Sequence, residues 1–291
     1  MRVAVLVGVS VVLAACTGGP VDEPVVTSTS AEQVYVSVGD SYATGYRPAD
    51  VGNPAGSSAD GFAYLVGRRA GFRLVNVACS GATSAQVRQD TGCAVANRAV
   101  DAPEPAATQL DAAVRELRAN RGRVGLVTVV IGGNDLSACV AGPDVLGCVA
   151  RGIEDVRTNL AAILTALREA AGDAPIVGLT YPDVFLGAWV SARLPDGQAL
   201  ARTSVPLFRD VLNPALSAEY GKIGAKFVDV TAVTGGYDPL DGASVDTAYG
   251  PVPDPVAKVC TLTYFCAHED VHPTPAGHET IASAVLAAIG R

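Results

Sequence analysis

Short apolar segments rich in β-branched residues recur along the chain, and they are typical of strands covered on both faces of a sheet. Between them, apolar residues recur every three or four positions, which is the spacing of a helix that buries one side. Strands that alternate with helices predict a parallel sheet with right-handed crossovers. The expected strands are residues 34–38, 74–78, 124–131, 176–180 and 226–230.

Helical spacing predicts helices that open at Phe62, run through 110–117 and 153–167, and begin near Pro275 at the C-terminal end. Residues 207–220 also have helical spacing, which Pro214 interrupts. The acidic, proline-rich stretch 238–255 has no clear period and predicts a long loop. Since an α/β fold of this length commonly forms one unit, we expect a single domain over residues 32–291.

Polar residues and glycines follow three of the expected strands at the point where each ends. The sequences are Gly-Asp-Ser at 39–41, Cys-Ser-Gly at 79–81 and Gly-Gly-Asn-Asp at 132–135. In open parallel sheets, ligands bind in the crevice beyond the carboxyl ends of the strands. The pattern therefore predicts that these three turns meet at one edge of the sheet and form a site there.

The N-terminus has the layout of a secretory signal. Residues 1–15 carry one positive charge, at Arg2, followed by an apolar run that is short for a membrane span. The sequence Leu-Ala-Ala-Cys at 13–16 resembles the bacterial lipobox, which implies that Cys16 is lipid-modified and becomes the first mature residue. The alternative is an ordinary signal peptide cut after Ala15 and a secreted product.

Residues 16–31 contain glycine, proline, serine and threonine without a hydrophobic period, and they predict a flexible tether. At ~5–6 Å × √n, a tether of this length holds the domain roughly 20 Å from its anchor. We therefore expect an exported protein that is lipid-anchored at the outer face of the cell membrane.

Composition and charge exclude several classes of protein. With 291 residues, 49% hydrophobic and 17% charged, the chain is too apolar for a disordered protein. The net charge of −8 without a basic run argues against a nucleic-acid partner. After the N-terminus, no apolar stretch is long enough for a span, which excludes a polytopic membrane protein. No metal-ligand spacing and no nucleotide-binding motif is present, so no metal or cofactor is expected. We expect a monomer.

The cysteines also indicate export. Seven are present, and setting Cys16 aside leaves an even number, which in an exported chain suggests disulfides. The six fall into three local pairs. Pairing in sequence order needs only short loop closures, and it is the connectivity that we favour among 15 alternatives. The expected bridges are Cys79–Cys93, Cys139–Cys148 and Cys260–Cys266.

The sequence Val-Gly-Asp-Ser-Tyr-Ala-Thr-Gly at 38–45 resembles the first conserved block of the GDSL/SGNH hydrolases, with Tyr42 in place of leucine. The later blocks follow in family order, at 80–82, 132–135 and 272–273, so the resemblance spans residues 34–291. The cysteine pairs are most similar to those of the secreted actinobacterial branch of esterases and phospholipases. The resemblance implies a flavodoxin-like three-layer α/β sandwich with a central, mostly parallel five-stranded sheet.

The resemblance also implies a serine carboxylic-ester hydrolase of the esterase or lipase type. Ser41 is the implied nucleophile and His272 the base that takes its proton. The implied oxyanion donors are the backbone N–H groups of Ser41 and Gly81 and the side-chain amide of Asn134. The expected partner is a small-molecule or lipid ester.

The acid that orients His272 is less well defined. The family usually places an aspartate three residues before the histidine, and that position holds Glu269. Asp270 lies two residues before His272, and some relatives use a backbone carbonyl instead. We favour Glu269 by position, with Asp270 as the alternative acid.

Other functions are compatible with parts of this pattern. The same residues would serve an acetylesterase or an acyl transferase that acts on envelope carbohydrates, because substrate choice lies in the loops and not in the conserved blocks. A non-catalytic lipoprotein that binds envelope ligands is the alternative from another class, although such a protein would not need complete blocks.

Overall fold

The computed structural model describes residues 32–51, 55–104, 107–137, 139 and 144–291. The expected signal peptide (1–15), Cys16 and the tether (16–31) lie outside the described residues. Residues Glu32–Arg291 form one compact unit. Over the described residues, none of the helices combines the length and the apolar character that a bilayer crossing requires.

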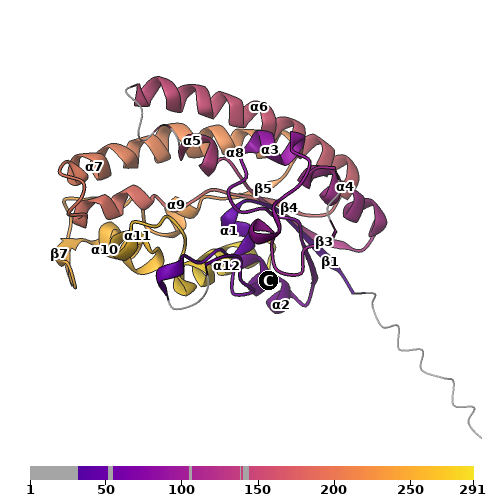
Figure 1. The fold of residues 1–291 in the computed structure, drawn as a ribbon, viewed down its shortest axis with the longest axis horizontal. Coiled ribbons are helices and arrows are strands. Elements are labelled where there is room, and N and C mark those ends of the chain that lie inside the picture. The colour runs from indigo at the N-terminus through magenta and orange to yellow at the C-terminus, as the bar shows by residue number, and fades with distance from the viewer. Residues whose placement is uncertain (1–31, 52–54, 105–106, 138, 140–143) are drawn as a thin grey trace, which may run out of the picture. The chain divides into compact units, whose positions relative to one another are not determined.

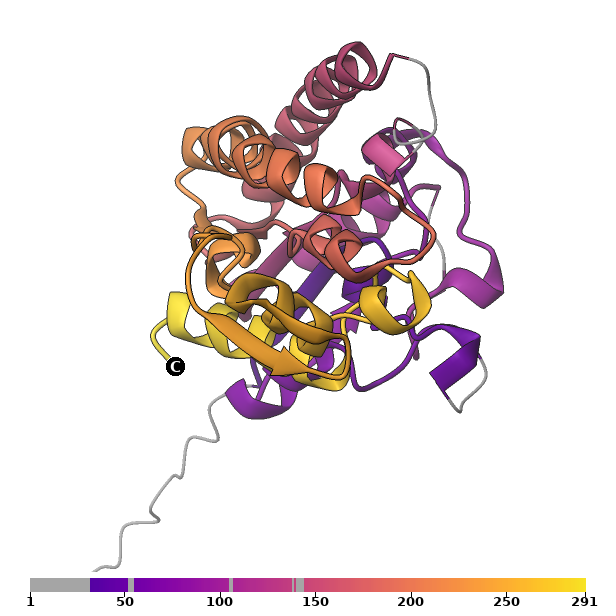
Figure 2. The ribbon, with the colours of Figure 1, turned by 90° about the vertical axis from the view of Figure 1, so that its left-hand side faces the viewer.

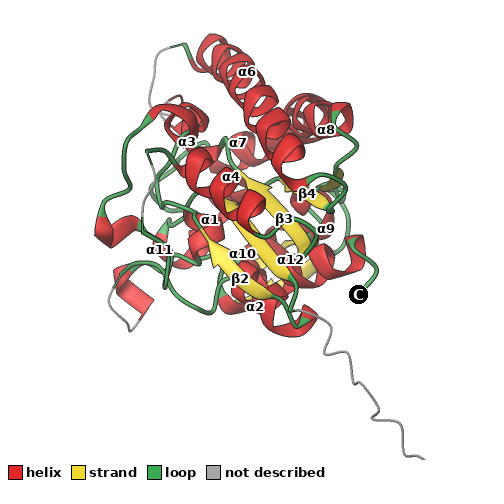
Figure 3. Cartoon of the chain, turned by 90° about the vertical axis from the view of Figure 1, so that its right-hand side faces the viewer, coloured by secondary structure: helices red, strands yellow, loops and turns green. Residues whose placement is uncertain are grey.

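The core of the domain is a parallel sheet with the strand order β2-β1-β3-β4-β5 (Figure 3). Each expected strand is confirmed to within two residues at either end. In register, Val36 of the first strand lies opposite Val75 on one side and Val127 on the other. The strands are β1 (Val34–Gly39), β2 (Arg73–Asn76), β3 (Val124–Val130), β4 (Ile176–Leu179) and β5 (Lys226–Val228).

Helices cover both faces of this sheet and complete the expected three-layer sandwich (Figure 1). Because side chains alternate along a strand, Val36 faces one apolar cluster and Tyr35 faces the other. The first face carries α3 (Ser84–Gln89), α4 (Gln109–Ala119), α6 (Val145–Ala171) and α8 (Asn213–Lys222). The opposite face carries α2 (Phe62–Ala70) and α12 (Pro275–Ala288).

The helical region before β5 differs in detail from the prediction. Helix α7 (Gly197–Leu207) runs into a π-helical turn, η5 (Phe208–Leu212), and then directly into α8. Pro214 lies in the first turn of α8 and does not end this helical segment. The change to π-helical hydrogen bonding falls on the residues just before it.

The prediction of an irregular loop over 238–255 is wrong in its second half. There β6 (Ser244–Thr247) and β7 (Gly250–Pro253) form an antiparallel hairpin (Figure 2). The hydroxyl of Thr247 donates to the carbonyl of Gly250 across the turn (2.8 Å). Proline is tolerated here because a two-stranded ribbon has outer edges where no N–H is needed. Because proline is rare inside strands, the sequence of this segment did not indicate a hairpin.

The three expected disulfides are confirmed as Cys79–Cys93, Cys139–Cys148 and Cys260–Cys266. Short helical segments occupy the connections between the main elements. They are α1 (Ser41–Thr44), η1 (Ala49–Val51), η2 (Val95–Asn97), α5 (Gly133–Ser137), η4 (Val184–Val190), α9 (Val230–Val233), α10 (Asp254–Leu262) and α11 (Phe265–His268).

Candidate active site

The turn after β1 presents Ser41. Gly39 ends the strand against β3, so closely that a Cβ there would lie 2.3 Å from the Val130 carbonyl oxygen. The buried Asp40 carboxylate then accepts the Tyr42 N–H (3.0 Å), which caps the single helical turn that begins at Ser41. Among the described residues, neither the N–H nor the Oγ of Ser41 has a hydrogen-bond partner. Both groups are therefore available to a substrate.

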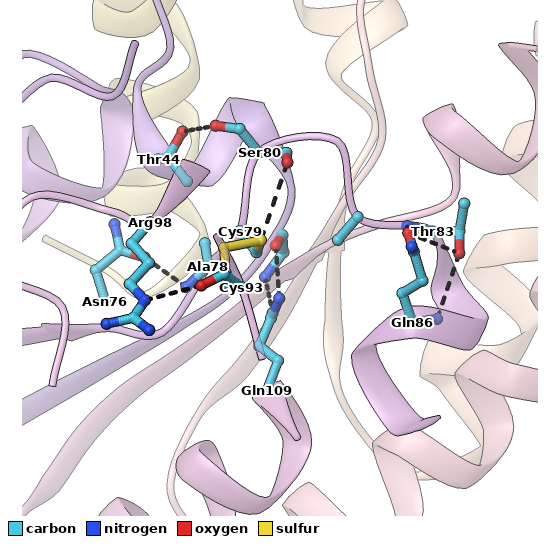
Figure 4. Close-up of a disulfide and its surroundings, with 12 residues drawn as sticks. Thr44, Asn76, Ala78, Cys79, Ser80, Thr83, Gln86, Cys93, Arg98 and Gln109 are labelled. Atoms are coloured by element: carbon cyan, nitrogen blue, oxygen red, sulfur yellow. Dashed lines mark hydrogen bonds between the residues drawn. A yellow bond between two sulfur atoms is a disulfide. The ribbon is translucent and has the colours of Figure 1, made fainter. Parts of the chain in front are cut away.

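The loop after β2 brings Gly81 to the same edge of the sheet. Its φ of +83° favours glycine, and nothing lies within 4 Å of the position a Cβ would take. The loop is tied to the turn that carries Ser41 by a hydrogen bond between the hydroxyls of Ser80 and Thr44 (2.7 Å), and the Cys79–Cys93 disulfide closes it from the other side (Figure 4). Within the described part of the chain, the Gly81 N–H meets no acceptor.

The segment after β3 brings Asn134 to this loop. The Asn134 amide donates one hydrogen bond to the Ala82 carbonyl (3.0 Å), and its second hydrogen is not used in any hydrogen bond between described residues. The Asp135 carboxylate accepts both the N–H (2.8 Å) and the hydroxyl (2.6 Å) of Ser84, which fixes α5 against the first turn of α3. Gly81 and Asn134 are thus brought together, as the sequence predicts. Asp135 has a structural role, because it binds the backbone and hydroxyl of Ser84.

His272 reaches the same site from the C-terminal part of the chain. The Tyr42 hydroxyl donates to the Val271 carbonyl (2.6 Å) across a separation of 229 positions. The Tyr46 ring lies 4.4 Å from the His272 ring, centroid to centroid. No hydrogen bond joins Ser41 Oγ to the imidazole among the described residues, which is common in unliganded sites. The contacts of Tyr42 and Tyr46 nevertheless hold the segment of His272 against the turn that carries Ser41.

Asp270 is the acid beside the imidazole. Its Oδ1 lies 2.8 Å from Nδ1 of His272 and also accepts the His272 backbone N–H (2.9 Å). Burial would raise the pKa of Asp270, but the hydrogen bonds from His272 and its charge outweigh burial and lower that pKa.

Glu269, which we favour by position, is not brought to His272. It ends α11 in the left-handed conformation (φ +52°), and its carboxylate accepts from the Ser191 hydroxyl (2.7 Å) and from Arg193 (3.0 Å). The left-handed residue turns the chain, so the next side chain, that of Asp270, faces the imidazole. The left-handed conformation of Glu269, which determines which acid faces His272, cannot be predicted from the local sequence.

Tyr181 also belongs to this group, although it is not among the predicted site residues. Its hydroxyl donates to the second oxygen of Asp40 (2.5 Å), and its ring packs edge-on against Tyr42 at 4.9 Å. Burial raises the pKa of Asp40 to about 6, although the hydrogen bond from Tyr181 and the nearby His272 oppose this shift. The signal was available, because Tyr181 directly follows β4 at the edge where the other three turns meet.

The other two histidines have different surroundings. His278 is buried in α12, where its Nδ1 accepts the Phe62 N–H (3.2 Å), and burial lowers the pKa of His278 to about 3. His268 packs against Tyr264, with ring centroids 6.0 Å apart. His278 therefore packs inside the domain.

A cavity of about 250 Å³ lies beside the loop that carries Gly81. Small apolar side chains and polar groups share its wall, and the Cys79–Cys93 disulfide forms part of it. The cavity therefore lies along the Gly81 loop, and neither Ser41 nor His272 lines it.

The fold and the site together define an α/β protein with the SGNH hydrolase fold. The model of the GDSL-like lipase/acylhydrolase family matches residues 37–280, a range that includes every candidate site residue from Ser41 to His272. The chain therefore belongs to the GDSL-like lipase/acylhydrolase family, and it is an ester hydrolase.

Two solved structures are similar to nearly the whole described domain. The extracellular lipase from Streptomyces rimosus is 21% identical, with a TM-score of 0.54 over 88% of this chain and 99% of that chain. Phospholipase A1 from Streptomyces albidoflavus is 20% identical, with a TM-score of 0.52 over 89% of this chain and 100% of that chain. At these identities the similarity shows a shared fold. A search among curated proteins finds no match.

A second buried carboxylate lies at the same edge of the sheet, and it generates a stability prediction. Asp183 follows β4 and accepts from the Ser204 hydroxyl (2.7 Å) and the Phe185 N–H (3.2 Å). Burial raises the pKa of Asp183 to about 7, against an ordinary value of 3.8. Between these two values the folded chain binds more protons than the unfolded chain. The free energy of unfolding therefore falls as the pH rises from about 4 to about 7.

We expect Asp183→Asn to lack this part of the pH dependence, because an amide does not titrate. Its free energy of unfolding should fall less than that of the wild type between pH 4 and pH 7, by a margin on the order of 4 kcal/mol. Urea denaturation at four pH values across this window measures both slopes. Asp241→Asn, which changes an exposed carboxylate, serves as the control. Equal slopes in all three proteins would contradict the prediction.

Proposed function

We propose that the protein hydrolyses carboxylic esters with Ser41 as nucleophile and His272 as general base. One observation carries this proposal: the imidazole, with Nδ1 held by Asp270, lies against the ring of Tyr46 in the segment that follows Ser41. With Nδ1 engaged, Nε2 is the ring nitrogen that can accept the serine proton. A serine hydroxyl is a weak nucleophile without such a neighbour.

In the acylation step, Ser41 Oγ attacks the ester carbonyl carbon while its proton passes to Nε2 of His272. The tetrahedral intermediate places a negative charge on the former carbonyl oxygen. The unused N–H groups of Ser41 and Gly81 and the second amide hydrogen of Asn134 are the donors that stabilise this charge. The intermediate then collapses, and the alcohol leaves with the proton from His272.

In the deacylation step, His272 takes a proton from water, and the resulting hydroxide attacks the acyl group on Ser41. The acid is released, and the proton on His272 returns to Ser41 Oγ. Each time the imidazole becomes charged, the Asp270 carboxylate stabilises that charge and fixes the ring tautomer. We therefore assign the acid role to Asp270, in place of Glu269, whose carboxylate is occupied by Arg193.

We also propose that the enzyme works at the outer face of the cell membrane, held there by a lipid on Cys16. The disulfides of the domain support export, because such bonds persist in oxidising compartments. A tether of roughly 20 Å lets the domain reach esters of lipids or of other envelope molecules.

A fluorophosphonate probe tests the nucleophile, because it reacts covalently with an activated serine. We expect the wild type to be labelled and to hydrolyse p-nitrophenyl esters, and Ser41→Ala to lose both properties while it stays folded. Ser244→Ala, which changes an exposed hydroxyl on β6, should keep its label. Labelling that survives in Ser41→Ala would show that another residue is the nucleophile, and a wild type that neither labels nor turns over would refute the proposed function.

Parallel kinetics of Asp270→Asn and Glu269→Gln test the acid. We expect Asp270→Asn to lower kcat by about 10²- to 10⁴-fold, because the amide cannot stabilise the imidazolium. Glu269→Gln should stay within a few-fold of the wild type, since it changes only the contacts with Ser191 and Arg193. The opposite order of effects would assign the acid role to Glu269. If both variants were near-normal, a backbone carbonyl would be favoured as the group that orients His272.

Cell fractionation of the full-length protein tests the anchor. We expect the wild type in the membrane fraction, with a mass increase on the peptide that begins at Cys16. Cys16→Ser should move the protein to the soluble exported fraction, with its esterase activity per molecule unchanged. A wild type found soluble, with an unmodified N-terminus, would instead support an ordinary signal peptide.

A further inference from the structure

The peptide group that joins Val271 to His272 is fixed at both of its polar ends. Its N–H, on His272, donates to Oδ1 of Asp270 (2.9 Å). Its carbonyl, on Val271, accepts from the Tyr42 hydroxyl (2.6 Å). A peptide plane bonded on both sides cannot rotate without breaking a hydrogen bond, so these two bonds set the direction in which the His272 side chain leaves the backbone.

Only one of these two partners belongs to the nucleophile turn. Asp270 is a near neighbour of His272 in sequence, so its bond shapes the histidine segment but does not place it relative to Ser41. Tyr42 directly follows Ser41, so its hydroxyl links the base to the nucleophile across the domain. The Tyr264 N–H also donates to the His272 carbonyl (2.9 Å), but it comes from the segment just before the base.

Tyr42 is itself held in place. Its side chain is buried, with 4% of the residue exposed. Its N–H donates to Asp40, and its ring packs edge-on against Tyr181, whose hydroxyl donates to the other oxygen of Asp40. These contacts fix the Tyr42 side chain, so its hydroxyl is held in place to donate to the Val271 carbonyl.

We propose that Tyr42 is a positioning residue, whose hydroxyl holds His272 in register with Ser41 during ester hydrolysis. This inference rests on the proposed function of Ser41 and His272. It assigns a role to the position at which the block differs from its leucine form, since leucine has no hydroxyl to donate. Misplacing a reacting group by about 1 Å can cost about 10²-fold in rate. The expected loss therefore falls on kcat, while substrate binding is unchanged.

The experiment compares Tyr42→Phe and Tyr42→Leu with the wild type. The first variant removes only the hydroxyl, and the second restores the leucine of the family block. We expect both to lower kcat and the rate of fluorophosphonate labelling by about 10- to 100-fold, with KM unchanged within two-fold. Restoring the family residue should thus reduce activity.

Tyr64→Phe is the matched control. The Tyr64 hydroxyl also donates to a backbone carbonyl, that of Val100 (2.9 Å), from a half-buried position in α2. We expect Tyr64→Phe to lose about as much thermal stability as Tyr42→Phe but to keep its kcat. This comparison separates positioning from general stability, and either folded Tyr42 variant is sufficient for it.

The outcomes are distinct. A Tyr42→Phe variant with wild-type kcat overturns the inference, as does a raised KM at constant kcat or an equal loss of kcat in Tyr64→Phe. These results leave the proposed function intact, because the wild type still labels at Ser41. A wild type that shows no labelling and no turnover overturns the proposed function and this inference together.

Discussion

Two parallel strands, β1 and β3, lie side by side in the centre of the sheet, and the chain leaves them toward opposite sides. After β1 it turns outward to β2, and after β3 it turns the other way to β4. In open parallel sheets, ligands bind beyond the strand ends at such a point. Ser41 follows one of these strands and Asn134 the other. The topology of the sheet, more than any single contact, thus brings the candidate site residues to one edge.

A buried carboxylate holds the connections at this edge of the sheet together. Asp40 receives hydrogen bonds from the turn that carries Ser41 and from Tyr181 beyond β4, and both offset the cost of its burial. Tyr181 in turn packs against Tyr42, which holds the segment of His272. Three connections that are distant in sequence are therefore fixed through one group. Leaving the buried Asp40 carboxylate without these partners would cost several kcal/mol of folding free energy. Loss of either partner is therefore expected to destabilise the whole group.

Much of this arrangement was predictable from local patterns. The strands, the parallel sheet and the disulfides follow from hydrophobic periodicity and cysteine spacing, which depend on neighbouring residues. The three-layer sandwich was implied by the resemblance to the GDSL/SGNH hydrolases. Glycines, asparagine and serine at three strand ends predicted the edge that carries the site. The features that were not predicted have separate physical reasons. Glu269 and Asp270 are distinguished by one left-handed backbone conformation, and the hairpin at β6 and β7 is hidden by prolines. The partnership of Tyr42 with Val271 is a long-range contact, which no local window contains.

The bond between Tyr42 and Val271 also bears on the order of events during biosynthesis. It joins positions 229 residues apart. A chain that emerges from the ribosome, or from a translocation channel, with its N-terminus first releases Ser41 well before the histidine. Contacts of such separation form late, because the intervening loop must close first. The two sides of the proposed active site consequently meet only after the long stretch of chain between them has been released.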